Sequence, residues 1–231
     1  MSKSYMRSAI GLLSLLLIAA TIGCGSSGTA NLRVLDAAPN EPQINTIVDG
    51  TTVNSNLAYL ANTGYISVSS GSRHIQVEPI NSATPIVDTT ITLADSTNTT
   101  VIVTGTTGIT PIVLTDETTA PNSGTAQIRL VNAAPSMASS DVYVVVDGTG
   151  ISGTSPLVSG LSFQTASAYQ TITLASGVAS ANYDVYYTEP GGQLPLLATG
   201  PISVASGEAL TVVSMNGLGG GFTFTALTDL Q

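Results

Sequence analysis

The feature that most constrains the fold of this sequence is an internal repeat. Residues 32–39, LRVLDAAP, match residues 128–135, IRLVNAAP. Further matching segments follow in the same order in both halves: Val48-Asp49-Gly50 and Val146-Asp147-Gly148, Tyr65 with Ser70-Gly71 and Tyr169 with Ser176-Gly177, Glu78-Pro79 and Glu189-Pro190, and Leu114-Thr115-Asp116 and Leu227-Thr228-Asp229. Chance is a poor explanation for so many matches in one order. We therefore predict two copies of one unit, each of ordinary domain size.

Composition indicates where these units end. Residues 118–125 are mostly Thr, Ala, Pro, Asn, Ser and Gly, which is typical of a short linker. We predict a first domain at residues 31–117, the linker at residues 118–125 and a second domain at residues 126–231.

Alternating apolar and polar residues predict an all-β fold. Segments such as Ile75-Gln76-Val77 would place apolar side chains on one face of a strand. We expect strands near residues 31–35, 44–48, 65–68, 74–78, 86–93, 99–104 and 110–114, and near residues 126–131, 141–146, 169–174, 182–187, 201–204, 209–215 and 221–227. This spacing predicts two tandem Ig-like antiparallel β-sandwich domains. Asp49-Gly50 and Asp147-Gly148 suit tight hairpin turns.

The first 23 residues have the layout of a signal peptide. Lys3 and Arg7 precede an uncharged apolar run, residues 9–22, and the small residue Gly23 follows it. This is the pattern of secretory signals, and the run is shorter than the ~20 residues that a membrane-spanning helix needs. We expect residues 1–23 to be removed. A permanent transmembrane helix is the alternative.

The residues around the only cysteine, Cys24, carry a resemblance. Ala20-Thr21-Ile22-Gly23-Cys24 resembles the bacterial lipobox, with Thr21 where that motif usually has Leu. The resemblance implies that the thiol of Cys24 carries lipid and anchors the protein in a membrane, with residues 24–30 as a flexible tether. Gly25 in place of Asp implies the outer membrane or the cell surface. An ordinary secretory signal with an unmodified Cys24 stays open.

The charge pattern excludes several classes of function. Five basic residues against 14 acidic ones give a net charge of −9, which becomes −11 when Lys3 and Arg7 leave with the signal peptide. The chain therefore lacks the basic surface that a nucleic-acid partner needs. It is 43% hydrophobic and 8% charged, the opposite of a disordered composition. A single cysteine cannot form a disulfide within the chain.

The repeat also resembles a known family. Two copies of Arg-x-x-[Asp/Asn]-Ala-Ala-Pro, each followed by Val-Asp-Gly and by a Tyr before Ser-Gly, are similar to the DUF4397 domain of exported bacterial proteins. The resemblance covers residues 31–230, with an insertion at residues 150–164 in the second copy. It implies a β-domain, found in tandem behind a lipobox, in the cell envelope. It brings no established activity and no catalytic residues.

Few side chains are candidates for chemistry. His74, the only histidine, lies in a strand-like stretch, and we expect it to face solvent without a nucleophile to activate. One His and a lipidated Cys24 cannot build a zinc site. Calcium bound by carboxylates stays open, although we interpret Asp95-Ser96-Thr97-Asn98 as a polar turn. We predict no catalytic residue, no metal site and no cofactor.

Two groups of residues have both a functional and a structural interpretation. Arg33 and Arg129 occupy matching positions, and each is either a ligand contact or, as we favour, an outward strand residue paired with an acid such as Asp36. The tyrosines of residues 183–187 are either a shallow binding face or, as we favour, packing residues. Strand alternation places Tyr183, Val185 and Tyr187 on one face and Tyr186 on the other.

These observations predict a lipid-anchored, non-enzymatic cell-envelope protein whose sandwich domains bind or act as spacers. Its contacts would be a membrane, through the lipid on Cys24, and a protein or glycan partner; the sequence does not identify ligand-binding residues. The alternative is a structural or adhesive surface subunit that self-associates through sheet edges, because edge lysines, a common defence against pairing, are missing. A calcium- or glycan-binding module and a hydrolase are the further alternatives.

Overall fold

The computed structural model describes residues 28–230, and every regular element in that range is a β-strand. The prediction of an all-β sandwich fold is confirmed. No helix in residues 28–230 is long and apolar enough to span a membrane. Cys24, the predicted signal peptide and most of the predicted tether lie outside the described residues.

The first half of the chain forms two four-stranded sheets. We call one inner sheet 1, with the order β4 (Ile66–Ser69), β1 (Thr29–Ala37), β7 (Asn98–Thr104) and β8 (Thr110–Asp116). We call the other outer sheet 1, with the order β3 (Thr51–Leu57), β2 (Ile44–Val48), β5 (Gly71–Pro79) and β6 (Val87–Leu93). The two sheets enclose an apolar core that includes Leu32, Ile44 and Ile75.

The second half repeats this plan. Inner sheet 2 contains β12 (Thr165–Ala166), β13 (Gln170–Thr173), β9 (Thr125–Asn132), β17 (Ala209–Asn216) and β18 (Phe222–Thr228). Outer sheet 2 contains β11 (Val158–Ser162), β10 (Ser139–Val146), β14 (Ser180–Thr188), β15 (Pro195–Ala198) and β16 (Ile202–Ala205). Residues 117–124, which contain no strand, connect β8 to β9.

The strands differ from the sequence prediction in two respects. The pairs β1–β7 and β9–β17 are parallel, whereas the other strand pairs are antiparallel. Parallel pairing is possible here because the chain crosses to the outer sheet between the two strands.

Four strands were not predicted from the sequence: β3, β11, β12 and β15. They lie at sheet edges, where a strand such as Thr51–Leu57 is largely polar and shows no clear alternation.

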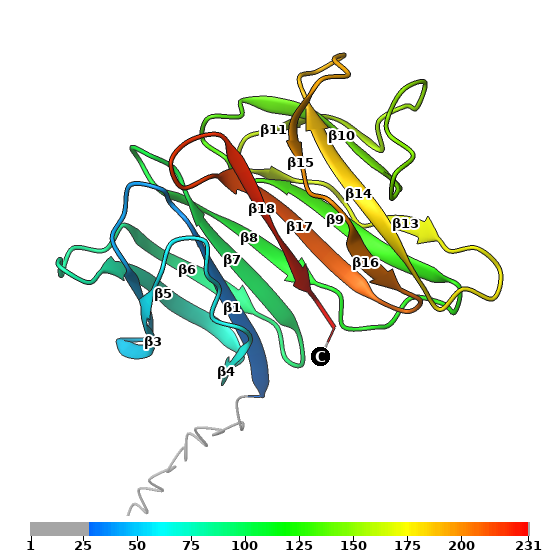
Figure 1. Cartoon of the computed structure of the whole chain (residues 1–231). Helices are drawn as coiled ribbons and strands as arrows, with labels where there is room; N and C mark the ends of the chain where they lie inside the picture. The colour runs from blue at the N-terminus through cyan, green and yellow to red at the C-terminus, as the bar shows by residue number, and fades with distance from the viewer. Residues whose placement is uncertain (1–27, 231) are drawn as a thin grey trace, which may run out of the picture.

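The two inner sheets pack face to face, so the molecule has four layers of sheet (Figure 1). A third apolar cluster fills this interface, with Leu35, Ile102 and Ile112 from inner sheet 1 and Val131, Val213 and Leu227 from inner sheet 2. Every residue of β7 is buried, as are residues 209–215 of β17, because these strands are covered on both faces.

Both predicted turns form, with Gly148 at a φ of 77°, but only the one in the first copy closes a two-residue hairpin. Asp49 and Gly50, with φ of 49° and 77°, join β2 to β3 in a two-residue hairpin. In the second copy the connection after Gly148 continues to Val158, the first residue of β11. Ile151 from this longer connection packs on Tyr143, Val145 and Tyr186, on the outside of outer sheet 2. The insertion therefore covers an aromatic surface that the first copy does not have.

Candidate functional site

Four charged side chains are buried together where the inner sheets meet. Arg33 of β1 and Arg129 of β9 are 3% and 4% exposed, and Asp116, at the end of β8, is 4% exposed. Asp229, one residue after β18, is fully buried. Each arginine lies in the first strand of its sandwich and each aspartate at or just after the last strand, so the cluster joins both ends of both repeats.

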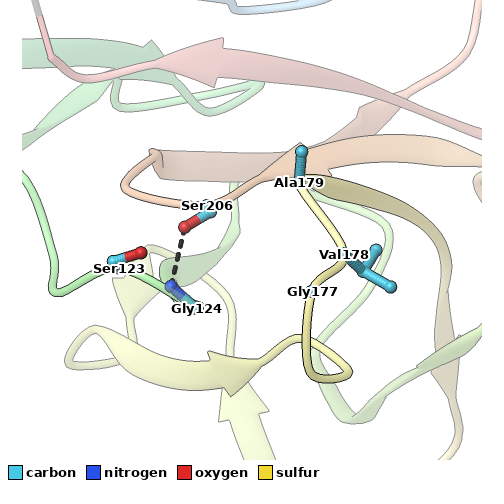
Figure 2. A pocket seen from close by; sticks show the side chains of 6 residues that line it. All are labelled: Ser123, Gly124, Gly177, Val178, Ala179 and Ser206. Carbon is cyan, nitrogen blue, oxygen red and sulfur yellow. Dashed lines mark hydrogen bonds between the residues drawn. The ribbon is translucent and has the colours of Figure 1, made fainter.

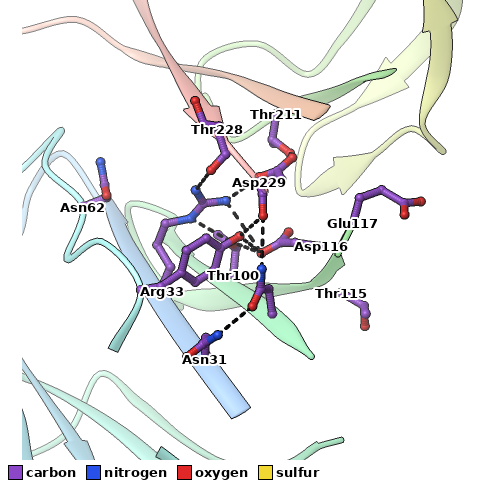
Figure 3. A network of polar contacts seen from close by, with 12 residues as sticks. Asn31, Arg33, Asn62, Thr100, Thr115, Asp116, Glu117, Thr211, Thr228 and Asp229 are labelled. Atoms are coloured by element: carbon purple, nitrogen blue, oxygen red, sulfur yellow. Dashed lines mark hydrogen bonds and ion pairs between the residues drawn. The ribbon is translucent and has the colours of Figure 1, made fainter. Parts of the chain in front are cut away.

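Arg33 reaches across the interface to the second sandwich. Its Nη2 donates to Asp229 Oδ1 at 2.6 Å, and its Nη1 donates to the carbonyl oxygen of Thr228 at 2.8 Å (Figure 3). Within its own sandwich, its Nε donates to Thr100 Oγ1 at 2.9 Å. The guanidinium group thus bonds to both sandwiches at once.

Arg129 makes the matching contacts in the opposite direction. It donates to the Asp116 carboxylate and, through Nη1, to the carbonyl oxygen of Thr115 at 2.9 Å. Its Nε donates to Thr211 Oγ1 at 3.0 Å within the second sandwich. The two halves of the network are therefore related by an approximate two-fold symmetry, as in an interface between identical subunits.

Threonine and tyrosine hydroxyls complete the coordination of the two carboxylates. Asp116 Oδ2 accepts from Thr100 at 2.5 Å and from Tyr65 at 2.7 Å. The corresponding oxygen of Asp229 accepts from Thr211 at 2.6 Å and from Tyr169 at 2.7 Å. Burial, and then the nearby Asp116, raises the pKa of Tyr65 well above its usual value, so its hydroxyl remains a donor.

Each arginine is also stacked on the tyrosine of its own sandwich. The Arg33 guanidinium carbon lies 4.4 Å from the centroid of the Tyr65 ring, and that of Arg129 lies 4.6 Å from the centroid of Tyr169. Cation–π contacts of this kind are stronger when the cation is desolvated. The network holds two positive and two negative groups, so no net charge is buried. Its arrangement favours a structural role, because its hydrogen-bonding groups are directed at one another.

The structure corrects the prediction for Arg33 and Arg129. We expected outward side chains paired with a local acid such as Asp36. The arginines instead lie between the inner sheets, and their acid partners come from the other copy. Asp36 is on the opposite face of β1, because residues 33, 35 and 37 face the other sandwich while residues 32 and 34 face the core of their own.

The predictions for His74 and for the tyrosines are confirmed. His74 lies on β5 with a side chain 44% exposed, and its Nε2 is 2.6 Å from Asp88 Oδ1. This hydrogen bond lowers the pKa of Asp88. Tyr183 and Tyr187 belong to the core of the second sandwich, whereas Tyr186 packs on the outside of outer sheet 2.

The polar segment at residues 95–97 forms the predicted turn between β6 and β7, and Asn98 is the first residue of β7. Within residues 28–230, no group of three or more His, Cys, Asp and Glu side chains is placed to hold a metal ion.

Two surface hollows adjoin the connection between the sandwiches. The first, about 320 Å³, is lined by Ser123, Gly124, Gly177, Val178, Ala179 and Ser206. Figure 2 shows that its side chains are small, and that Gly124 N donates to Ser206 Oγ, at 2.7 Å. The second, about 330 Å³, is lined by Glu117, Thr119, Ala120, Pro121, Asn122, Thr125, Gln127 and Thr171. Glu117 is the one charged residue among these lining residues.

Comparison with known proteins finds a family match for the first copy of the repeat. The family model described as "Domain of unknown function (DUF4397)" matches residues 30–143. This chain contains a DUF4397 domain. The match begins in β1 and ends in β10, so it includes every strand of the first sandwich. No curated protein matches the chain.

Two solved structures share a distant likeness. A DUF3823 family protein from Bacteroides ovatus ATCC 8483 is 14% identical, with 77% of this chain and 98% of that chain covered at a TM-score of 0.25. CBMbc, of family CBM26, from Eubacterium rectale Amy13K, solved in complex with maltoheptaose, is 10% identical, with 85% and 96% covered and a TM-score of 0.25. We draw no functional conclusion from either.

Proposed function

We propose that this chain is a lipid-anchored, non-catalytic cell-envelope protein in which two DUF4397-type sandwiches form one rigid spacer or binding body. The observation that supports this most is the symmetric Arg–Asp network. It joins the two sandwiches through buried ion pairs, Arg33 with Asp229 and Arg129 with Asp116, and it is flanked by an apolar interface. Two domains connected only by a linker would move independently.

The symmetry of the network supports the assignment of the second sandwich to the same type as the first. Arg33, Tyr65, Thr100 and Asp116 have counterparts in Arg129, Tyr169, Thr211 and Asp229, which make the same contacts. The strand orders also correspond, with β1–β7–β8 matched by β9–β17–β18.

The position of the first strand supports anchoring at one end of the body. Asn31, near the start of β1, donates to Asn98 Oδ1 at 2.9 Å, and Asn98 donates to the carbonyl oxygen of Asp229 at 3.1 Å. A tether that precedes β1 would therefore attach beside the junction of the two sandwiches. Both would extend from the membrane as a unit and present Thr- and Ser-rich surfaces to a protein or glycan partner.

Anchoring is tested by producing the full-length chain in a bacterium with an outer membrane, beside a Cys24→Ser variant. We expect the natural chain in the membrane fraction, with a lipid-modified N-terminal peptide that begins at Cys24 in mass spectra. Protease treatment of intact cells then distinguishes surface exposure from a periplasmic location. Recovery of the natural chain in the aqueous fraction, cleaved elsewhere and with an unmodified thiol, would contradict the proposal.

The open edge of inner sheet 2 favours a second candidate function, self-association. The strand β18 carries no charged residue and pairs with β17 in an uninterrupted register. Regular, uncharged edge strands are templates for further pairing. This candidate predicts concentration-dependent assembly in light scattering, reduced by Ala226→Lys at an exposed position of β18. A monomer at all concentrations would exclude it.

A further inference from the structure

A buried carboxyl group outside the Arg–Asp network has an unusual environment. Asp36 is fully buried on β1, on the face toward the core of the first sandwich. Its Oδ1 accepts a hydrogen bond from Ala38 N at 3.0 Å. Its Oδ2 is buried and has no hydrogen-bond partner among the described residues. An ionised carboxylate can only accept hydrogen bonds, so an isolated buried oxygen of this kind is costly.

The second sandwich has an amide at the same position. Asn132 Oδ1 accepts from Ala134 N at 3.2 Å, as Asp36 does from Ala38. The Nδ2 of Asn132, the counterpart of the unpaired oxygen, donates to the carbonyl oxygens of Met137 at 2.8 Å and Leu161 at 3.2 Å. In the second copy a hydrogen-bond donor therefore occupies the position that the unpaired oxygen of Asp36 has in the first.

The turns that follow the two residues are alike, which makes the comparison direct. Glu41 N donates to the carbonyl oxygen of Ala38 at 3.2 Å, and Met137 N donates to that of Ala134 at 2.9 Å. Aligned without a gap, DAAPNE and NAAPSM make Glu41 the counterpart of Met137, whose carbonyl oxygen accepts from Asn132. A protonated Asp36 would offer an O–H at the position of the amide N–H.

We propose that Asp36 is a proton-dependent latch: its carboxyl group is protonated in the folded protein and donates in place of an amide, and loss of the proton to solvent loosens the first sandwich. Burial raises the pKa of Asp36 to about 7, and repulsion by Glu41 adds to this effect while the hydrogen bond from Ala38 opposes it. The latch would therefore respond to pH near neutrality. The titratable groups that face Asp36 are Glu41, in the turn after β1, and Tyr59, in the segment after β3.

Contacts of the Asp36 main chain show which region would loosen. Asp36 N donates to the carbonyl oxygen of Ala61 at 3.0 Å, and Leu60 N donates to that of Asp36 at 2.8 Å. Between these residues and β3 lies Tyr59, whose hydroxyl donates to the carbonyl oxygen of Asn216 in the second sandwich at 2.5 Å. Ionisation of Asp36 would thus weaken the segment of residues 58–62 and one link between the two sandwiches.

The first test follows the carboxyl carbon of Asp36 by NMR, in the full-length chain labelled at aspartate and solubilised in detergent. We expect its resonance to titrate with a midpoint near 7, the raised value. The amide of Leu60, which donates to the carbonyl oxygen of Asp36, should lose protection from hydrogen exchange above this pH, relative to the amide of Ala134 in the same molecule. Titration at the ordinary aspartate value near 4 would overturn the proposal.

The second test compares Tm across pH for the natural chain, Asp36→Asn and Asn132→Asp. The folded state keeps the Asp36 proton to a higher pH than the unfolded state, so Tm of the natural chain falls as pH rises from about 4, the unfolded value, to about 7, the folded value. Asp36→Asn should flatten this fall and Asn132→Asp should steepen it. Asp95→Asn, at an exposed acid in the turn between β6 and β7, is the control and should leave the slope unchanged.

An unchanged slope in Asp36→Asn would overturn the proposal. If that variant fails to fold, the carboxyl titration of the natural chain decides alone.

Discussion

Arg33 donates hydrogen bonds to three groups, two of which belong to the other sandwich. Removal of two charges from water is costly, and a buried pair stabilises the folded state only when both groups keep their partners. Here each carboxylate accepts from an arginine, a threonine and a tyrosine, so the cost of burial is offset by charge-assisted hydrogen bonds. Substitution of one residue of the network therefore leaves its buried partners without hydrogen bonds, and the loss of stability exceeds the loss of that residue's own contacts.

At this scale we predict that Arg33→Ala lowers the free energy of unfolding by about 3–5 kcal/mol, because it leaves the Asp229 carboxylate buried without its ion pair. Chemical denaturation measures the loss. Arg73→Ala is the matched control. Arg73 pairs with Asp49 at the surface, where the two side chains are 25% and 43% exposed, and its loss should cost at most about 1 kcal/mol. Equal effects of the two variants would contradict a special role for the network.

The four-layer arrangement determines how deeply the residues of each strand are buried. The strand β7 is buried on both faces: Val101 and Val103 belong to the core of the first sandwich, and Ile102 belongs to the interface between the inner sheets. On the neighbouring strand β8, at the edge of the same sheet, Val113 is 45% exposed. Adjacent strands of one sheet thus contribute differently to stability.

For this element, we expect Ile102→Ala to cost about 2–5 kcal/mol, since it opens a cavity in the interface between the sandwiches. Val113→Ala, an aliphatic truncation on β8, should change stability by no more than about 0.5 kcal/mol. Equilibrium denaturation of the two variants tests this. A small effect of Ile102→Ala would mean that the inner sheets do not pack tightly.

At the scale of the whole molecule, we expect the two sandwiches to unfold as one cooperative unit. The Arg–Asp network, the apolar cluster and the bond from Tyr59 to Asn216 all cross between the sandwiches. Loss of one sandwich would therefore expose apolar surface and unpaired charges on the other. This coupling makes partial unfolding unfavourable.

We accordingly expect one calorimetric transition for the natural chain, with agreement between the calorimetric and van't Hoff enthalpies. In a variant that combines Arg33→Ala with Arg129→Ala, both ion pairs are lost, and we expect the transition to broaden or separate into two. Two resolved transitions in the natural chain would show that the sandwiches unfold independently.

The sequence by itself determined the β class, the repeat and the positions of most strands, because strand alternation and turn residues such as Asp49-Gly50 are local signals. It also indicated that Arg33 and Arg129 are equivalent. Only the tertiary structure decided that these arginines are buried and that their partners lie at the far end of the other copy. Alternation identifies the two faces of a strand, but whether the second face meets water or another sheet depends on how the two sandwiches pack, and residues far apart in the chain determine that packing.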